Sequence, residues 1–188
     1  MELLTSFYYP NNKYREKELT FTLINNLNKP FITKIKLLIT NKDYMLFKNS
    51  EIIHHNNFNK IEFILHDSIP TYKYLLTLAS TFENTIICIC NSDIEFFIDN
   101  IEILNMLNDK TCFFITRHEG DHNTNLITNF GGSHDAFIFK SNSLKSNLQN
   151  IDLTYIDYPQ NTPGIEALLT IFFIEKLNYE IKNPCFEV

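Results

Sequence analysis

Short apolar segments alternate with amphipathic stretches along the whole chain. Continuous or alternating apolar residues predict strands at Leu3–Tyr8, Lys34–Ile39, Ile61–His66, Thr85–Cys90, Thr111–Arg117, Ala136–Lys140 and Tyr179–Lys182. Apolar residues at helical spacing predict helices at Tyr14–Asn28, Pro70–Phe82, Phe97–Leu107 and Pro163–Leu177. Strands that alternate with helices predict one α/β domain over residues 1–188, with a mostly parallel sheet.

Two segments of this pattern indicate where the sheet is most buried and where a ligand would bind. Thr85–Cys90 is almost entirely apolar, as expected for a central strand that is covered on both faces. Cys88 and Cys90 should lie on one face of that strand. The polar stretch His118–Phe130 predicts a loop, and loops at strand ends are where α/β proteins place ligands.

Composition and charge narrow the class of protein. The 188 residues carry 16 basic and 22 acidic side chains, a net charge of −6, which argues against a nucleic-acid binder. The longest apolar runs are far shorter than a membrane span requires, and the first residues do not resemble a secretory signal. The four cysteines form neither a zinc spacing nor an evident disulfide framework. We therefore expect a cytoplasmic protein without a membrane span.

The segment Asn91-Ser92-Asp93 follows the predicted central strand. A carboxylate at the carboxyl end of such a strand faces the crevice where ligands bind. In an extended segment, Asp93 and Glu95 would project to the same side and supply oxygen ligands that suit Mg²⁺ or Mn²⁺. The alternative is that Asn91 and Asp93 only end the strand and cap the next helix.

His118-Glu119-Gly120-Asp121-His122 matches the zinc-protease pattern H-E-x-x-H. That motif works on a helix, where both histidines lie on one face. Here it follows a predicted strand and contains Gly-Asp, which favours a turn. The match therefore supports only an alternative function, a small zinc metallopeptidase that uses His118 and His122.

Two further segments combine glycine with an acidic residue. In Gly131-Gly132-Ser133-His134-Asp135, paired glycines allow close approach to a ligand, although an ordinary tight turn explains them equally well. Pro163-Gly164-Ile165-Glu166 opens the last long predicted helix. Glu166 would there complement the helix dipole, or would face the same crevice as Asp93.

Six short segments, in order, resemble motifs of one enzyme class. They are Leu4-Thr5-Ser6-Phe7-Tyr8 with Arg15 and Glu18, Pro70-Thr71-Tyr72, Asn91-Ser92-Asp93-Ile94, Gly132-Ser133-His134-Asp135-Ala136-Phe137-Ile138-Phe139, Pro163-Gly164 with Glu166, and Asn183-Pro184. Together they resemble the GT-A nucleotide-sugar-dependent glycosyltransferases, in particular small single-domain members of bacteria and large DNA viruses. The resemblance implies one Rossmann-like GT-A domain with a mostly parallel mixed sheet, and, for a viral member, a place in the host cytoplasm.

The resemblance also implies an activity and a set of site residues. A hexosyl or deoxyhexosyl group would pass, with inversion, from a nucleotide-sugar donor, UDP-sugar favoured, to a hydroxyl of a glycan or glycoprotein acceptor. Glu166 would be the catalytic base, and Asp93 would hold Mn²⁺ or Mg²⁺. Asp135 is the second candidate for the catalytic base and would otherwise bind hydroxyls of the donor or acceptor sugar. The implied donor-binding residues are Thr5, Ser6, Phe7, Arg15, Thr71, Tyr72, Asn91, Ser92 and Gly132.

Two departures from the family pattern keep an alternative open. The first position of the family's Asp-x-Asp motif is Asn91, and no histidine follows Asn183-Pro184 in this sequence as a second metal ligand. A catalytically inactive module that binds nucleotide sugars would explain both departures. The sequence leaves open the donor base, the sugar, the acceptor, whether transfer inverts or retains the sugar configuration, whether the chain is part of a longer protein, and the oligomeric state.

Overall fold

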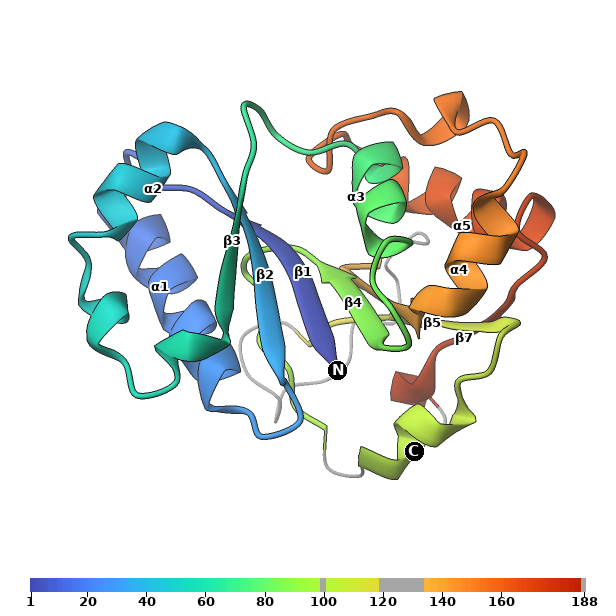
Figure 1. Cartoon of the computed structure of the whole chain (residues 1–188), viewed down its shortest axis with the longest axis horizontal. Coiled ribbons are helices and arrows are strands. Elements are labelled where there is room, and N and C mark those ends of the chain that lie inside the picture. Colours follow the sequence, from blue (N-terminus) through green and yellow to red (C-terminus); the bar gives the residue numbers. More distant parts are fainter. Residues whose placement is uncertain (99–100, 119–133, 187–188) are drawn as a thin grey trace.

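A computed structural model describes residues 1–98, 101–118 and 134–186 and shows a seven-stranded sheet in the order β3-β2-β1-β4-β6-β5-β7 (Figure 1). All neighbouring strands run parallel except the two pairs that contain β6. The predicted mostly parallel mixed sheet is therefore confirmed. The strands are β1 (Glu2–Phe7), β2 (Lys34–Ile39), β3 (Ile61–Leu65), β4 (Ile86–Cys90), β5 (Thr111–Ile115), β6 (Ala136–Lys140) and β7 (Glu180–Lys182).

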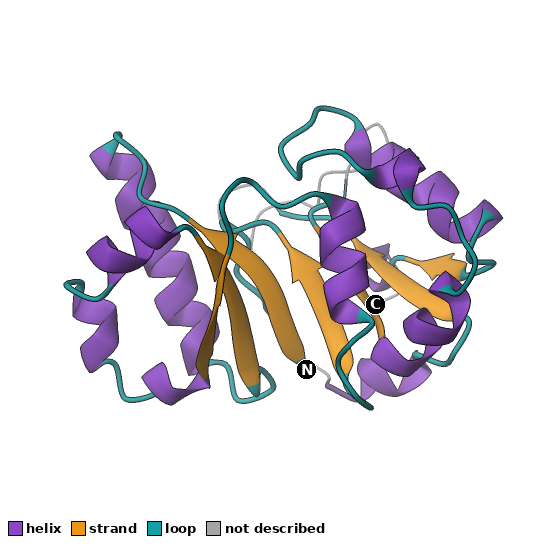
Figure 2. Ribbon diagram, turned by 45° about the horizontal axis from the view of Figure 1, so that its top comes forward, coloured by secondary structure: helices purple, strands orange, loops and turns teal. Residues whose placement is uncertain are grey.

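Helices cover both faces of the sheet (Figures 1 and 2). On one face, α1 (Lys13–Asn28) and α2 (Asn41–Phe47) bury Leu19, Leu23 and Phe47 in one core cluster. On the other, α3 (Tyr72–Ala79), α4 (Ser141–Leu148) and α5 (Ile165–Glu175) form a second cluster. The two clusters make a three-layer α/β domain.

Strand β4 lies between these two cores. Cys88 and Cys90 pack into the cluster beneath α1, while Ile87 and Ile89 pack into the other. This confirms that the two cysteines share one face of a strand that is buried on both sides. All four cysteines of the chain are free thiols.

The antiparallel direction of β6 decides where its first residue lies. Ala136 pairs with Cys90, the last residue of β4, and also with Ile115, the last residue of β5. The start of β6 therefore lies at the same edge of the sheet as the carboxyl ends of β1, β4 and β5. Asp135, directly before β6, is brought to that edge.

Three helical segments differ from the sequence prediction. Helices α2 and α4 were not predicted, because α2 is only seven residues long and α4 is rich in serine and asparagine, which have low helix propensity. The predicted helix Phe97–Leu107 is wrong: the structure shows a 3-10 helix at Ile101–Met106. The predicted segment Phe97–Leu107 contains three isoleucines and two asparagines, which disfavour a regular α-helix.

The other predicted elements are present, with ends that shift by a few residues. Helix α3 begins at Tyr72 and not at Pro70, and the hydroxyl of Thr71 caps it by accepting a hydrogen bond from the Tyr74 N–H at 3.2 Å. Within the described ranges, none of the helices has the length and apolar character that crossing a membrane requires.

Candidate active site

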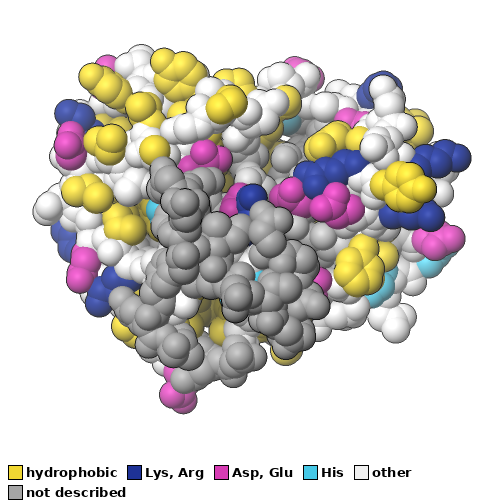
Figure 3. Space-filling view, turned by 180° about the vertical axis from the view of Figure 1, so that it is seen from behind, with side chains coloured by type: hydrophobic (Ala, Val, Ile, Leu, Met, Phe, Trp, Pro, Cys, Tyr) yellow, Lys and Arg dark blue, Asp and Glu magenta, His cyan; other side chains and the backbone are white. Residues whose placement is uncertain are grey.

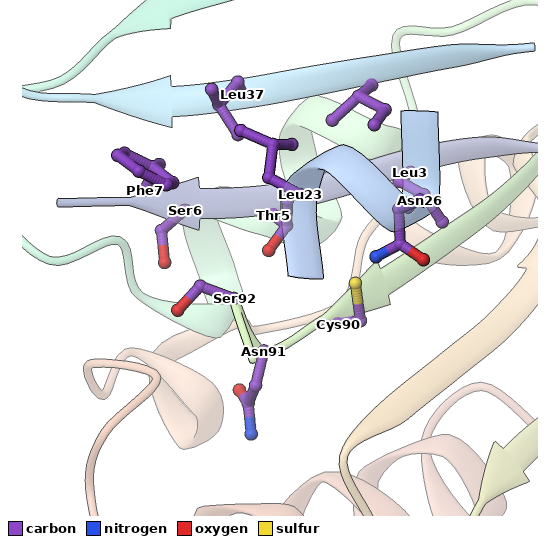
Figure 4. A pocket seen from close by; sticks show the side chains of 11 residues that line it. Leu3, Thr5, Ser6, Phe7, Leu23, Asn26, Leu37, Cys90, Asn91 and Ser92 are labelled. Atoms are coloured by element: carbon purple, nitrogen blue, oxygen red, sulfur yellow. The ribbon is translucent and has the colours of Figure 1, made fainter. Parts of the chain in front are cut away.

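Side chains from the ends of β1 and β4 line a narrow crevice at the carboxyl edge of the sheet. Five predicted donor-binding residues are among them, Thr5, Ser6, Phe7, Asn91 and Ser92 (Figure 4). The crevice encloses only about 10 Å³, roughly the room that one water molecule needs. A nucleotide would therefore lie across the mouth of the crevice and not within it.

The polar groups of β1 differ in what they contact. Ser6 donates a long hydrogen bond of 3.5 Å to the Gln160 side chain, and the Gln160 amide in turn donates to the carbonyl of Cys90 at 3.5 Å. The buried Thr5 hydroxyl has no hydrogen-bond partner among the described residues. Because a buried hydroxyl without a partner is costly, Thr5 marks a place for a ligand hydroxyl or a water. Phe7 belongs to the core, with its ring edge-on to Phe47.

Helix α1 delivers a guanidinium group to the segment after β4. The Asn12 side chain caps the helix by accepting hydrogen bonds from the N–H groups of Tyr14 and Arg15. Arg15 then donates to Asp93 at 2.7 Å and to Glu18 at 2.8 Å. Burial lowers the pKa of Arg15, but the hydrogen bonds to these two carboxylates raise it by more. The pKa of Arg15 therefore lies above its ordinary value.

Asp93 and Glu95 do not act together at this edge. Glu95 forms an ion pair with Lys29 at 3.0 Å and accepts a hydrogen bond from Asn25 at 2.8 Å, near the carboxyl end of α1. Asp93 instead contacts Arg15 at the amino end of the same helix. The expectation that both carboxylates project into one site is therefore wrong, because the chain after β4 runs alongside α1.

The buried side chain of Asn26 holds this segment in place, a role that sequence reasoning missed. Its amide nitrogen donates to the carbonyl of Ile94 at 2.8 Å, and its oxygen accepts from the N–H of Phe96 at 3.1 Å. Two hydrogen bonds from one buried amide fix the course of residues 94–96. They thereby fix the position of Asp93 against α1.

Asp135 lies at the start of β6 and is only 7% exposed. One of its carboxylate oxygens accepts from the Asn91 amide at 3.2 Å and from Arg117 at 2.9 Å. Burial raises the pKa of Asp135, the charge of Arg117 lowers it, and the charge of Asp93 raises it; the net result is an increase above the ordinary value. Arg117 was not predicted as a site residue, although it lies two residues after the end of β5.

Glu166 lies in the first turn of α5. Gly164 precedes the helix with φ +80°, a left-handed conformation that favours glycine, and this turn starts the helix. Burial raises the pKa of the Glu166 carboxyl, the nearby charge of Asp135 raises it as well, and Arg117 lowers it. The charges of Asp135, Arg117 and Glu166 therefore interact in one site, and a raised pKa suits a general base.

The remaining predicted residues are less directly involved. Thr71 is used as the cap of α3, and the ring of Tyr72 is buried in the core, 5.7 Å from Phe137. Gly132 and His122 lie outside the described residues, and His118 is exposed just after β5. The structure thus groups Ser6, Arg15, Asn91, Asp93, Asp135 and Glu166, and adds Arg117 and Gln160 to them. Acidic and basic side chains lie next to one another on the back face of the molecule (Figure 3).

The described residues do not fit the expected divalent cation. Mg²⁺ and Mn²⁺ take oxygen ligands, chiefly carboxylates. Here Asp93 is paired with Arg15, Asp135 with Arg117 and Glu95 with Lys29, so each of these three carboxylates already has a protein cation against it. Among the described residues, no three His, Cys, Asp or Glu side chains come together as a metal cluster.

A larger groove of about 450 Å³ lies between residues 154–158 and the start of α5. Tyr155, Tyr158, Ile165 and Leu168 line it. At 100° per residue, Ile165 and Leu168 lie on the side of α5 away from Glu166. Glu166 itself is not among the residues that line the groove, although its neighbours Gly164 and Ile165 are.

Solved structures share this fold, although no protein-family model and no curated protein matches the chain. A 4-diphosphocytidyl-2C-methyl-D-erythritol synthase from Anaerococcus prevotii has a TM-score of 0.57 at 12% identity, covering 97% of this chain and 85% of its own. A cytidylyltransferase from Leptospira borgpetersenii has a TM-score of 0.55 at 12% identity, covering 97% and 74%.

The apo form of the glycosyltransferase GlyE from Streptococcus pneumoniae has a TM-score of 0.56 at 12% identity. The match covers 97% of this chain and 45% of GlyE. Similarity at such low identity is evidence for the fold and not for a shared activity. The chain therefore has the fold of nucleotide-diphospho-sugar transferases.

Proposed function

We propose that the protein is a glycosyltransferase that moves a sugar from a nucleotide-diphospho-sugar, with a UDP-sugar favoured, to a hydroxyl of a glycan or glycoprotein. The observation that carries this proposal is the convergence of Arg15, Asp93, Asp135 and Glu166 at the carboxyl edge of the sheet. In open α/β sheets, ligands bind in the crevice outside the carboxyl ends of the strands. The fold of nucleotide-diphospho-sugar transferases supports a donor of that class.

The donor would lie over the ends of β1 and β4. Ser6 and Ser92 offer hydroxyl groups at the crevice mouth, while the buried Thr5 hydroxyl, which lacks a protein partner, would bind a water beneath them. The nucleoside hydroxyls would contact these groups, while the diphosphate would extend toward Asp93 and Asp135. This direction leads the sugar toward Glu166 on α5.

The chemistry is an inverting displacement at the anomeric carbon of the donor sugar. The acceptor oxygen forms a bond to that carbon, and the bond between the carbon and the β-phosphate oxygen breaks, so the electron pair leaves on the nucleoside diphosphate. Glu166 takes the proton of the acceptor hydroxyl as general base, and a raised pKa strengthens it in that role. Asp135 accepts hydrogen bonds from sugar hydroxyls.

Nucleotidyl transfer is the second activity found among the structural neighbours. It requires the binding of a nucleoside triphosphate, and phosphate cradles are commonly built from glycine-rich loops. In this chain β1 is followed by Tyr8-Tyr9-Pro10-Asn11-Asn12, which contains no glycine. This segment favours sugar transfer over nucleotidyl transfer.

A panel of nucleotides tests the proposed function. We expect a nucleoside diphosphate or its sugar conjugate to raise the melting temperature, because a ligand that binds only the folded state stabilises it. Nucleoside triphosphates with a sugar 1-phosphate should yield no pyrophosphate. Pyrophosphate release would show a nucleotidyltransferase, and the absence of any nucleotide effect would overturn the proposal.

A further inference from the structure

The groove of about 450 Å³ beside helix α5 has no part in the donor site described above. One wall is the chain from the 3-10 helix Thr154–Ile156 to Tyr158, and the other is the start of α5 with the residues before it. Its volume lies within the range of about 300–1,000 Å³ that is usual for sites of small ligands. A groove of this size beside the helix that carries the proposed base is a candidate acceptor site.

The lining of the groove combines aromatic rings with hydroxyl groups. Tyr155 and Tyr158 are 64% and 49% exposed, so both rings are open to a ligand. Thr154 and Thr162 add side-chain hydroxyls, and none of the described residues that line the groove is charged. A sugar ring presents C–H groups on its faces, which pack on aromatic rings, and hydroxyls around its edge. This lining therefore suits an uncharged saccharide.

Charges beside the groove disfavour an anionic ligand. The Thr154 hydroxyl donates a hydrogen bond to Asp152 at 2.8 Å. Asp157, between the two tyrosines in the chain, pairs with Lys73 at 3.0 Å. Two carboxylates and one ammonium group leave this wall with an excess of negative charge, which repels phosphates and acidic sugars.

Backbone hydrogen bonds fix the wall that carries the tyrosines. The carbonyl of Tyr158 accepts from the Tyr72 N–H at 3.1 Å, and the Gln160 N–H donates to the carbonyl of Pro70 at 3.0 Å. Residues 158–160 therefore run along the start of α3. Because this backbone is in place before a ligand binds, the groove loses little conformational entropy on binding.

Gln160 connects the same wall to the donor crevice. Its side chain contacts Ser6 and the carbonyl of Cys90, each at 3.5 Å. Burial raises the pKa of Tyr72, the charge of Glu166 raises it further, and a hydrogen bond with Gln160 lowers it. Tyr72 thus contacts Gln160 while lying within electrostatic range of the proposed base. The groove wall, the donor crevice and Glu166 are therefore neighbours.

The start of α5 leaves a path from the groove to Glu166. Gly164 and Ile165, the two residues before Glu166, line the groove. A Cβ atom placed on Gly164 would meet no described heavy atom within 4 Å apart from its chain neighbours. Cα–Cβ bonds of a helix tilt toward its N-terminus, so Glu166 leans toward this end of α5. A ligand in the groove would reach the carboxylate around the end of the helix, across Gly164.

We propose that this groove binds the acceptor, and that the acceptor is an uncharged saccharide whose rings stack on Tyr155 and Tyr158. The inference rests on the proposed function and narrows its acceptor to neutral sugar units. One hydroxyl of the terminal sugar passes Gly164 and gives its proton to Glu166 while its oxygen bonds to the anomeric carbon of the donor. The nucleoside diphosphate leaves with the electron pair of the broken bond.

Ligand-observed NMR tests the proposal, because it detects weak binding. The unaltered protein would be mixed with UDP, GDP and CDP and then with a panel of neutral oligosaccharides, sialylated glycans and unglycosylated peptides. We expect at least one neutral oligosaccharide to bind. If no neutral oligosaccharide binds, or if only sialylated glycans or peptides bind, the proposal is overturned.

Variants locate the binding groups. Tyr155→Ala and Tyr158→Ala should each weaken binding of that oligosaccharide by roughly 10-fold, as expected for the loss of a stacked ring. The phenylalanine variants keep the ring and should keep most of the affinity. The matched control is Tyr14→Ala, which removes an 85% exposed tyrosine from α1 and should leave the affinity unchanged. Because all three tyrosines are exposed, we expect each variant to fold, and thermal unfolding verifies this.

The inference and the proposed function fail in different ways. Unchanged oligosaccharide affinity in both alanine variants, with nucleoside diphosphate binding intact, would overturn the inference alone. If no nucleoside diphosphate binds to the parent protein, the proposed function fails. The acceptor role of the groove then fails with it, even where an oligosaccharide still binds.

Discussion

Replacing Asn91 with aspartate tests the contact that joins β4 to the start of β6. The Asn91 amide donates a hydrogen bond to the Asp135 carboxylate at 3.2 Å. Asn91→Asp removes this donor and places a second carboxylate against one that is 7% exposed. The same substitution introduces the first aspartate of the Asp-x-Asp pattern that Asn91-Ser92-Asp93 resembles, so it also tests whether this site accepts a metal ion.

Two effects set the magnitude. A lost hydrogen bond to a charged group costs about 1.5–3 kcal/mol. Repulsion between the two carboxylates costs at most about 4 kcal/mol at pH 7, because one of them would bind a proton if the cost were higher. Arg117, at 2.9 Å from Asp135, offsets part of the repulsion. We therefore expect Asn91→Asp to lower the free energy of unfolding by about 2–4 kcal/mol at pH 7.

The loss should depend on pH. Repulsion raises the pKa of the carboxyl pair in the folded state above its pKa in the unfolded chain. At pH values between these two pKa values, the folded state therefore binds more protons than the unfolded chain. Stability of the variant relative to the parent therefore falls as pH rises through this window and recovers as pH falls below it. Urea unfolding at pH 7 and about pH 5 measures both effects.

Asn108→Asp is the matched control for the added charge. Asn108 is exposed, and its side-chain oxygen accepts from the Lys110 N–H at 2.8 Å, as an aspartate oxygen would. The control should change stability by less than about 0.5 kcal/mol. If Asn91→Asp is as stable as the parent at pH 7, the hydrogen bond to Asp135 is absent and this reasoning is refuted. Stabilisation of the variant by Mn²⁺ alone would show that two carboxylates suffice for a metal site.

Three further predictions concern catalysis and the support of the site. Glu166→Gln should leave nucleoside diphosphate affinity unchanged in calorimetry but reduce sugar transfer by roughly 10²–10⁴-fold, and the acidic limb of kcat/KM in the parent should lie above the ordinary pKa of glutamate. Asp135→Asn should mainly raise KM for the donor. If Asp135→Asn binds the donor but does not turn it over, while Glu166→Gln stays active, the roles of the two residues are reversed. Asn26→Ala should cost about 1–3 kcal/mol in urea unfolding, because it removes the hydrogen bonds to Ile94 and Phe96; an unchanged midpoint would contradict this role.

The fold could be predicted from local sequence patterns, whereas part of the candidate site could not. The continuous apolar run that ends at Cys90 predicted a buried central strand, and this is what β4 is. The antiparallel pairing of β6 with β4 and β5 has no local signal, because strand direction and register are set by tertiary packing. Yet that pairing alone brings Asp135 next to Asn91 and Arg117.

The arginines show what the sequence could still have indicated. Arg15 was expected in the site from the family resemblance, but its contact with Asp93 depends on how the chain after β4 follows α1. Arg117 is the last residue of a predicted strand and one of only two arginines in the sequence, a compositional signal that was not used. Glu95 was misplaced because alternation along an extended segment was assumed where Asn26 redirects the chain.

Release of nucleoside diphosphate from nucleotide-sugar donors tests the central claim most directly. The parent protein and Glu166→Gln would each be incubated with a panel of donors, UDP-sugars first, simple glycan acceptors and a metal chelator. The account predicts that the parent releases nucleoside diphosphate from at least one donor in step with sugar transfer, and that Glu166→Gln does so at least about 100-fold more slowly. If a nucleoside diphosphate binds but no donor is consumed, with chelator or with added Mn²⁺, the protein is a binding module and the proposed transferase activity is contradicted.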